Sequence, residues 1–224
     1  MAIQYQENGR IFTLHTDHST YQMKADYYGN LLHLYYGDRT EGSMEYLLTF
    51  GDRGFSPNPY EAGDDRTYSL DALPQEYPYQ GSGDFRSPAL AVEQADKSYG
   101  LNLRYGGYEI SKGKYSLPGL PSMYGEGLEE SLKIHLTDQV SGLAVTLLYG
   151  VFPGYDIITR AVCVKNEGNG PAALKRVYSA CLDFLHGEYD LIQFYGRHAM
   201  ERNFQRTALC HGAQVIGSRR GTSS

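Results

Sequence analysis

Apolar and polar residues alternate with a period of two along most of the chain, and residues that favour turns separate the alternating stretches. This pattern is typical of half-buried β-strands, because successive side chains of a strand point to opposite faces of a sheet. No stretch of ten or more residues has the spacing of an amphipathic helix. We therefore predict strands over residues 11–16, 21–25, 31–36, 101–105, 132–137, 143–149, 157–165 and 174–184, with another beginning at Gln214.

The spacing and chemistry of the turns favour a β-sandwich. Strands recur at intervals of roughly 8–12 residues, which is more typical of sandwiches than of small barrels. Asn8-Gly9 predicts a hairpin turn, and Gly106-Gly107 predicts a bulge or turn. Residues 143–148 are almost continuously apolar, which predicts a strand buried on both faces. We expect one all-β domain over residues 1–224.

A long interruption of the strand pattern lies at residues 51–88. This segment contains five prolines, several glycines and aspartates, and many aromatic side chains. A loop of this length inside a compact domain is usually either functional or disordered. Because the segment has much apolar surface to bury, we expect an ordered loop that serves a function.

Composition and charge narrow the possible partners and the compartment. The net charge is −6, and Arg219-Arg220 is the only basic cluster, whereas binding to nucleic acid needs a concentrated basic face. No apolar run is long enough to span a membrane, and the first residues lack the pattern of a secretory signal. The odd set Cys163, Cys181 and Cys210 has no metal spacing, and we expect the first two to be buried free thiols. A cytoplasmic protein that binds neither nucleic acid nor membrane is predicted.

No set of residues in the chain has the spacing of a catalytic, metal or cofactor site. The seven histidines form no metal motif, and no nucleophile elbow or phosphate-binding glycine loop is present. Neighbouring carboxylates on a strand would point to opposite faces, so they do not form the pair that glycoside hydrolysis needs. We therefore expect no catalytic residue, metal ligand or cofactor site, although five aspartates were candidates for a pair: Asp64, Asp65, Asp71, Asp84 and Asp183.

The 51–88 loop nevertheless has the residue types that bind sugars. Aspartates and arginines recur in it beside aromatic residues, as in Asp52-Arg53, Asp65-Arg66 and Asp84-Phe85-Arg86. Carboxylates and guanidinium groups hydrogen-bond in fixed geometry, and aromatic faces can cover the apolar side of a sugar ring. The alternative is that these pairs only brace the loop against the sandwich. Chemistry alone leaves both interpretations open.

Several motifs resemble the N-terminal region of bacterial α-galactosidases of glycoside hydrolase family 36. The resemblance covers essentially the whole chain and is most specific between Leu73 and Ala89. The motifs are Leu73-Pro74-Gln75-Glu76-Tyr77-Pro78, Gly83-Asp84-Phe85-Arg86-Ser87-Pro88-Ala89, and residues 52–59, 65–71, 117–121 with Tyr124, 157–160, 201–202 and 219–224.

The resemblance implies a modular enzyme of which this chain is one part. In the family an N-terminal β-supersandwich precedes a (β/α)₈ barrel and a small C-terminal β domain. The enzymes are retaining, they act on α-galactosides such as melibiose and raffinose, and both catalytic aspartates lie on the barrel. A retaining mechanism requires these carboxyl groups to lie about 5–5.5 Å apart. The chain alone is therefore expected to be inactive and to pack on the catalytic barrel of the same protein.

The resemblance also assigns a role to the 51–88 loop. In tetrameric members of the family this loop reaches the active site of a neighbouring subunit. By motif position, Asp52 and Arg66 would approach the α-galactoside substrate there, while Glu76, Asp84 and Arg86 would be structural. The chain is thus expected to belong to a homo-oligomer.

Two departures from the family pattern keep other interpretations open. The barrel is absent. Gly196 to Met200 stands where the family often has a Gly-Ala-Trp stretch, and the chain has no tryptophan but 21 tyrosines. A freestanding carbohydrate-binding sandwich would bind sugars by itself, and a purely structural sandwich would bind neither sugar nor partner. An exposed apolar face for docking would distinguish the enzyme domain from the structural sandwich.

Overall fold

The computed structural model describes residues 1–52, 54, 58–184 and 187–218. The chain divides into two compact units, Met1–Asp183 and Phe184–Ser224. We describe each unit by itself. Several residues that carry the resemblance, among them Arg53, Phe55 and residues 219–224, lie outside the described part.

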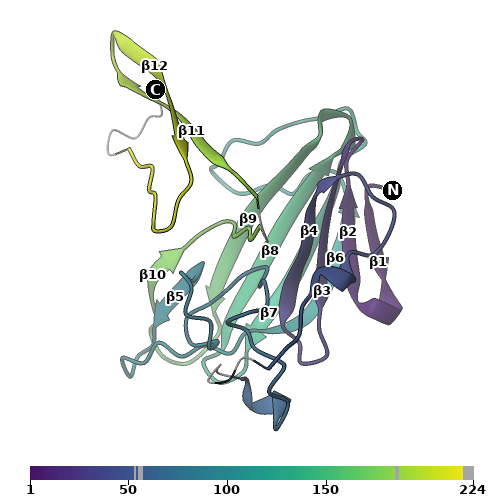
Figure 1. The fold of residues 1–224 in the computed structure, drawn as a ribbon, viewed down its shortest axis with the longest axis vertical. Helices are drawn as coiled ribbons and strands as arrows, with labels where there is room; N and C mark the ends of the chain where they lie inside the picture. Colours follow the sequence, from purple (N-terminus) through teal and green to yellow (C-terminus); the bar gives the residue numbers. More distant parts are fainter. Residues whose placement is uncertain (53, 55–57, 185–186, 219–224) are drawn as a thin grey trace. The chain divides into compact units, whose positions relative to one another are not determined.

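The first unit begins with a four-stranded antiparallel meander (Figure 1). Short turns join consecutive strands, so neighbours in sequence are neighbours in the sheet. The predicted turn at Asn8-Gly9 is confirmed as part of a hairpin, in which the chain reverses through a 3₁₀ turn over Glu7–Gly9 and through Arg10 at φ 51°. The strands, in sheet order, are β1 (Ile3–Gln6), β2 (Ile11–His15), β3 (Ser19–Ala25) and β4 (Leu31–Asp38).

A second antiparallel sheet of four longer strands follows, beside a small two-stranded sheet. The predicted irregularity at Gly106-Gly107 is confirmed as a bulge, since the register of β6 against β7 shifts between Tyr105 and Gly107. The large sheet has the order β6 (Arg104–Lys112), β7 (Glu130–Asp138), β8 (Leu143–Phe152) and β9 (Ile157–Asn166), and the small one pairs β5 (Leu90–Glu93) with β10 (Ala173–Val177).

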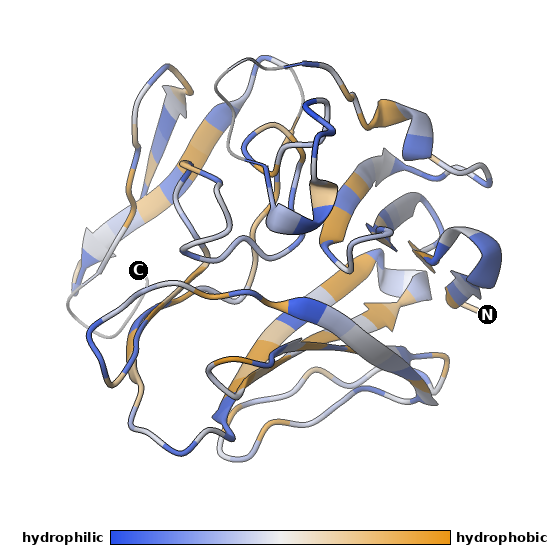
Figure 2. Cartoon of the chain, turned by 90° about the horizontal axis from the view of Figure 1, so that it is seen from below, coloured by the Kyte–Doolittle hydropathy of each residue, from blue (hydrophilic) through white to orange (hydrophobic). Residues whose placement is uncertain are grey.

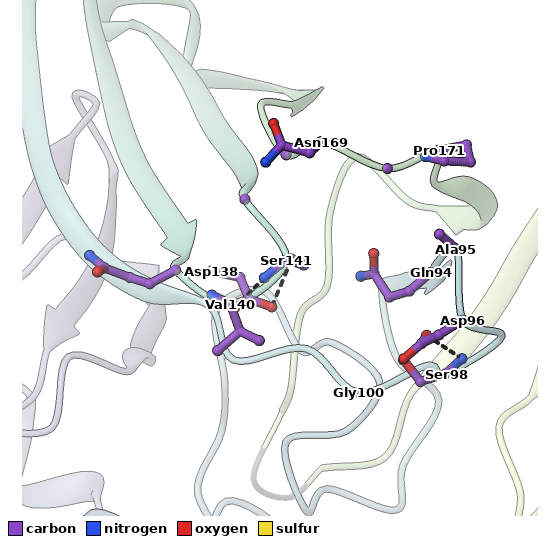
Figure 3. Close-up of a pocket in the computed structure, with 14 residues that line it drawn as sticks. Gln94, Ala95, Asp96, Ser98, Gly100, Asp138, Val140, Ser141, Asn169 and Pro171 are labelled. Carbon is purple, nitrogen blue, oxygen red and sulfur yellow. Dashed lines mark hydrogen bonds between the residues drawn. The ribbon is translucent and has the colours of Figure 1, made fainter.

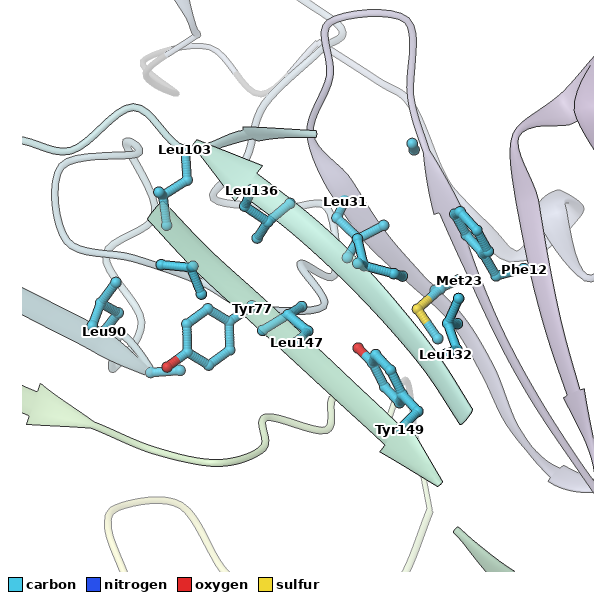
Figure 4. Close-up of a cluster of buried hydrophobic side chains, with 14 of the residues drawn as sticks. Phe12, Met23, Leu31, Tyr77, Leu90, Leu103, Leu132, Leu136, Leu147 and Tyr149 are labelled. Carbon is cyan, nitrogen blue, oxygen red and sulfur yellow. The ribbon is translucent and has the colours of Figure 1, made fainter. Parts of the chain in front are cut away.

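The hydrophobic core lies between the two large sheets. Phe12 and Met23 from the first sheet meet Leu132 and Tyr149 from the second (Figure 4), and all four side chains are fully buried. The alternation behind this packing is visible as orange and blue bands along the strands in Figure 2. Each fully buried apolar side chain contributes about 1.5–3 kcal/mol, so this layer dominates the stability of the unit.

The all-β sandwich prediction is confirmed. The described residues form strands and four single 3₁₀ turns and contain no α-helix. None of them forms a helix that is both long and apolar enough to cross a bilayer.

Several predicted strand boundaries are wrong. The strand expected at 101–105 begins at Arg104, and the one expected at 174–184 ends at Val177. The predicted burial of β8 on both faces holds only for its second half: Ala144 and Thr146 are partly exposed, whereas every residue from Leu147 to Phe152 is buried. No strand begins at Gln214.

The second unit contains one hairpin, formed by β11 (Asp190–Arg197) and β12 (Met200–Ala208). Its strands were not predicted from the sequence. The turn between them covers the Gly196 to Met200 stretch that departs from the family pattern. Phe194 and Phe204 lie opposite each other on the hairpin, with ring centroids 5.8 Å apart, and both are more than half exposed.

Candidate functional site

The connection between β4 and β5 contains the 51–88 loop, and its second half is attached to the first sheet. The His33 N–H donates to the carbonyl of Pro74 at 2.8 Å, and the Glu76 N–H donates to the carbonyl of Leu31 at 2.9 Å. Leu32 and Gln75 form an antiparallel bridge. The loop thus returns along the edge of β4, which fixes its course relative to the sandwich.

The two residues predicted to approach a substrate lie together. Arg66 Nη2 is 3.3 Å from Asp52 Oδ1, and the side chains are 64% and 54% exposed respectively. The carboxylate of Asp52 also accepts the N–H of Gly54 at 2.8 Å, and Arg66 donates to the Gly54 carbonyl at 3.5 Å. Residues 14 positions apart therefore form one exposed polar pair.

This geometry leaves the pair available to a ligand. An exposed ion pair contributes only about 0–1 kcal/mol, because water screens it and two long side chains must be held in place. A sugar hydroxyl can donate to the Asp52 carboxylate and accept from the Arg66 guanidinium at little electrostatic cost, since each group keeps unused hydrogen-bonding positions. The arrangement can therefore bind hydroxyl groups.

Residues next to Arg66 fix the local backbone. Asp65 accepts hydrogen bonds from the N–H of Thr67 at 2.9 Å and from its hydroxyl at 2.6 Å. These two bonds lower the pKa of the Asp65 carboxyl below its usual range. Asn58 donates through its side-chain amide to the Asp65 carbonyl at 2.8 Å, which ties the two sides of the loop together.

Tyr68 follows Arg66 by two residues and, unlike the exposed pair, is only 4% exposed. Its hydroxyl donates to the carboxylate of Asp26 and accepts from the amide of Asn30 at 2.6 Å. Its ring packs edge-on against Tyr28 at 4.7 Å and stacks on Phe50 at 6.4 Å between centroids. Burial of this hydroxyl raises the pKa of Tyr68 well above its usual value, so it acts as a neutral donor.

Arg104 of β6 extends the contacts of Tyr68 to another part of the loop. It donates to the side-chain carbonyl of Asn30, and its guanidinium lies 3.2 Å from Glu61 Oε1. Glu61 belongs to the 3₁₀ turn Tyr60–Ala62 in the middle of the loop. The first half of the loop is therefore held by polar side chains of both large sheets.

Glu76 anchors the second half of the loop with a fully buried carboxylate. Arg160 Nη2 lies 2.9 Å from Glu76 Oε1, and the Tyr149 hydroxyl donates to the same oxygen at 2.6 Å. The Tyr21 hydroxyl donates at 2.8 Å, and His33 Nδ1 is 3.2 Å from Glu76 Oε2. Burial alone would raise the pKa of Glu76, but Arg160 and these hydrogen bonds outweigh it and lower the pKa.

Arg86 holds the last part of the loop. Its guanidinium contacts both carboxylate oxygens of Asp84 at 2.9 and 2.8 Å and lies 3.0 Å from Asp183. It also donates to the backbone carbonyls of Leu70 and Leu73 at 3.2 and 2.7 Å. Glu76, Asp84 and Arg86 thus brace the loop, which agrees with the structural role expected of them.

A second polar depression lies at one end of the sandwich, between three turns (Figure 3). Its volume is about 490 Å³. The carboxylates that line it are engaged in turns, since Asp96 accepts the Ser98 N–H at 3.0 Å and Asp138 accepts the N–H groups of Val140 and Ser141. Its lining includes no aromatic ring, so it lacks a surface on which a sugar could stack.

The predicted burial of two cysteines is wrong. Cys163 is exposed because its side chain points away from the core of the sandwich, and Cys181 is only partly buried. Both are free thiols, as is Cys210. Within the described part of the chain, no three histidine, cysteine, aspartate or glutamate side chains converge as a metal site.

Sequence reasoning did not identify the residues that support the pair. Asp26 and Asn30 lie far in sequence from Tyr68 and from Arg104, and no local pattern connects these three parts of the chain. The only available signal was the short interval from Asp26 to Asn30, which is typical of a turn whose aspartate binds its own backbone. Asp26 does accept the Asn30 N–H at 2.7 Å.

Comparison with known proteins gives one consistent family. Residues 29–224 match the glycosyl hydrolase family 36 N-terminal domain. The bifunctional α-galactosidase/sucrose kinase AgaSK of Mediterraneibacter gnavus is 54% identical over the whole chain, which corresponds to 24% of that protein. α-Galactosidase AgaA of Geobacillus stearothermophilus is 38% identical over the whole chain and 31% of its own length.

Solved structures agree with this assignment. The galactosidase domain of AgaSK superposes on the whole chain with a TM-score of 0.94 at 54% identity, and the chain covers 31% of it. The family 36 α-galactosidase AgaB of Geobacillus stearothermophilus gives a TM-score of 0.90 at 40% identity, over 99% of this chain and 30% of that one. The chain therefore spans about a quarter to a third of the length of these relatives.

Proposed function

The chain belongs to glycosyl hydrolase family 36 as its N-terminal domain, and from this premise we propose that it is the accessory domain of a retaining α-galactosidase. In this proposal residues 1–224 form a single β-supersandwich domain that packs on the catalytic barrel of the same protein. The parent enzyme hydrolyses terminal α-galactosides such as melibiose and raffinose. The domain itself supplies no catalytic residue and is inactive alone.

We propose further that the loop acts in a neighbouring subunit of a homotetramer. Asp52 and Arg66 would bind sugar hydroxyls at the entrance of that subunit's active site. The observation that carries this proposal is the exposed Asp52–Arg66 pair, which is more than half accessible on a loop held from beneath by buried polar contacts. By contrast, Asp84, which braces the loop together with Arg86, is only 2% exposed.

A cytoplasmic location is part of the proposal. It is supported by the three free thiols, two of them exposed, because exposed thiols persist in a reducing compartment. The net charge of −6 gives no basic surface for nucleic acid or anionic lipid.

Hydrolysis of p-nitrophenyl α-D-galactopyranoside tests the proposal. The chain alone should be inactive, and the protein that continues through the barrel should be active. In that longer protein, Asp52→Ala and Arg66→Ala should each lower kcat/KM roughly 10- to 100-fold, the value of a lost hydrogen bond to a charged group. Hydrolysis by the short chain would overturn the proposal that the domain is inactive alone. Unchanged kcat/KM in both variants would overturn the proposed role of Asp52 and Arg66.

A complementation experiment tests whether the loop acts between subunits. Asp52→Ala subunits are co-assembled with subunits that lack the catalytic nucleophile of the barrel. If the loop acts in trans, an intact loop of the second kind serves an intact barrel of the first, and mixed oligomers recover part of the activity. If the loop serves its own barrel, mixing leaves the activity at the sum of the two separate variants.

A further inference from the structure

We infer that Tyr68 is a positioning residue that sets the geometry of the Asp52–Arg66 pair by holding both arms of the loop at once. This inference rests on the proposed function, because it explains how an exposed pair is kept in place for a sugar ligand. The hydroxyl of Tyr68 bonds to Asp26 and Asn30 and not to the pair, so the residue acts through the backbone that carries Asp52 and Arg66.

The position of Tyr68 along the loop is the first argument. Tyr68 follows Arg66 by two residues, and its ring stacks on Phe50, which precedes Asp52 by two residues. The ring planes are inclined by only 27°, with centroids 6.4 Å apart. One side chain therefore connects the backbone entering the pair with the backbone leaving it.

The anchorage of the hydroxyl is the second argument. Asp26 and Asn30, which bind it, lie in the turn between β3 and β4 and are 7% and 2% exposed. The Asn30 N–H also donates to Asp26 Oδ1 at 2.7 Å, so the carboxylate is already oriented when Tyr68 binds it. The tyrosine hydroxyl thus ties both arms of the loop to a buried turn of the first sheet.

The contacts of the pair itself are the third argument. Among the residues that the structure describes, the polar contacts of the Asp52 and Arg66 side chains are with each other and with Gly54, all inside the loop. Such contacts preserve the pair but do not fix it relative to the sandwich. That connection runs through the buried ring and hydroxyl of Tyr68, whose second ring neighbour is Tyr28 at 4.7 Å.

The test uses the full-length protein and removes only the hydroxyl, as Tyr68→Phe. Tyr77→Phe is the matched control, because Tyr77 is equally buried and its hydroxyl also makes a hydrogen bond, to the Tyr178 carbonyl at 2.9 Å. For p-nitrophenyl α-D-galactopyranoside we expect Tyr68→Phe to raise KM about tenfold with little change in kcat, since uniform binding is lost. Tyr77→Phe should leave KM within about twofold of the wild-type value.

A double-mutant cycle separates positioning from general destabilisation. In an Arg66→Ala background, Tyr68→Phe should leave KM unchanged, because there is no longer a pair to position. An equal rise of KM in that background would overturn the inference. An effect of Arg66→Ala without any effect of Tyr68→Phe would also overturn it and leave the proposed function standing. Absence of an effect of Arg66→Ala would instead remove the proposed function.

Hydrogen exchange provides a readout that does not depend on activity. In Tyr68→Phe, the amides of the described residues between Phe50 and Arg66 should exchange faster than in wild type, while Tyr77→Phe should leave them unchanged. Asp26→Asn is a second variant in case Tyr68→Phe does not fold, because it keeps one of the two acceptor oxygens that bind Asn30 and Tyr68 and replaces the other with an amide group. It should shift KM and exchange in the same direction by a smaller factor, and unchanged exchange in both variants would contradict the inference.

Discussion

The carboxylate of Glu76 is fully buried and compensated by neighbouring polar side chains. Arg160 supplies the opposite charge, and the hydroxyls of Tyr21 and Tyr149 supply hydrogen bonds. A buried ion pair gives little net stability compared with an apolar replacement, but removing one partner leaves the other charge uncompensated. The main effect of losing Glu76 would therefore be to leave the buried charge of the Arg160 guanidinium uncompensated.

Glu76→Gln should lower the free energy of unfolding at pH 7 by about 3–5 kcal/mol. The folded-state pKa of Glu76 is lowered from 4.5, so its contribution is fully present above that pH and is lost as pH falls through the folded pKa. Urea unfolding from pH 7 down to about pH 2 measures both effects, because the contribution is lost below pH 4.5. The wild type should lose more stability across this range than the variant.

Glu41→Gln is the control for this prediction, because the Glu41 side chain is 73% exposed and its bond to Arg39 lies at the surface. It should change stability by less than about 1 kcal/mol at any of these pH values. Equal losses in Glu76→Gln and Glu41→Gln would show that the buried network contributes nothing specific.

At the scale of elements, the turn between β7 and β8 depends on one glycine. Gly142 has φ +72°, a conformation that residues with a Cβ rarely adopt. A Cβ at this position would lie 2.6 Å from the Cα of Gly168, in the turn that follows β9. The two turns therefore approach so closely that a side chain at Gly142 would clash with the backbone of Gly168. It would also be strained by the left-handed conformation.

Gly142→Ala should lower the free energy of unfolding by about 2–4 kcal/mol, the sum of left-handed strain and a backbone clash. Gly154→Ala is the matched control, since a Cβ there meets nothing within 4 Å. The control should stay within about 0.5 kcal/mol of wild type. Thermal or urea unfolding of the three proteins would contradict the argument if the two variants were equally stable.

Strands were predictable where burial alternates and were missed where it does not. Burial alternates along most of β7 and along the first half of β8, and this pattern located both strands within a few residues. Leu101 and Leu103 are buried in the core yet precede the strand, because the Leu101 N–H bonds to the Gln80 carbonyl of the loop. Alternation reports burial and not strand pairing, so it placed that strand too early. The β11–β12 hairpin exposes apolar side chains and has no buried face to produce a pattern.

The candidate site was predictable only in part, for a related reason. Asp52 and Arg66 were identified through a resemblance, and the structure shows that they are paired. Tyr68 contacts Asp26 across 42 residues of sequence, and Arg104 contacts Asn30 across 74. Such contacts leave no periodic signal in the sequence, so only the three-dimensional structure identifies the side chains that hold the site.

At the scale of the whole molecule, apolar exposure is uneven along the sequence. Of the 28 exposed large hydrophobic side chains on the described residues, 14 lie between Leu174 and Ile216. That stretch is about a fifth of the chain, and it includes aromatic residues such as Tyr178, Phe194 and Phe204. Water-exposed apolar surface gathered in one stretch marks a region that another part of a protein covers. The chain spans a quarter to a third of the length of its relatives, and the proposed function would place the remainder of the parent protein over these side chains.

The chain alone should therefore bind the dye 8-anilinonaphthalene-1-sulfonate more strongly, per mole of chain, than the full-length protein does. Phe194→Ser combined with Phe204→Ser should reduce binding to the short chain, because both exposed rings are removed without disturbing a buried core. Leu120→Ser removes an apolar side chain that is also exposed but lies outside this stretch, so it should change dye binding much less. If the full-length protein bound as much dye as the short chain, the exposed residues after Leu174 would not be the surface on which the remainder of the enzyme packs. The function of these residues would then have to be sought in contacts between separate molecules.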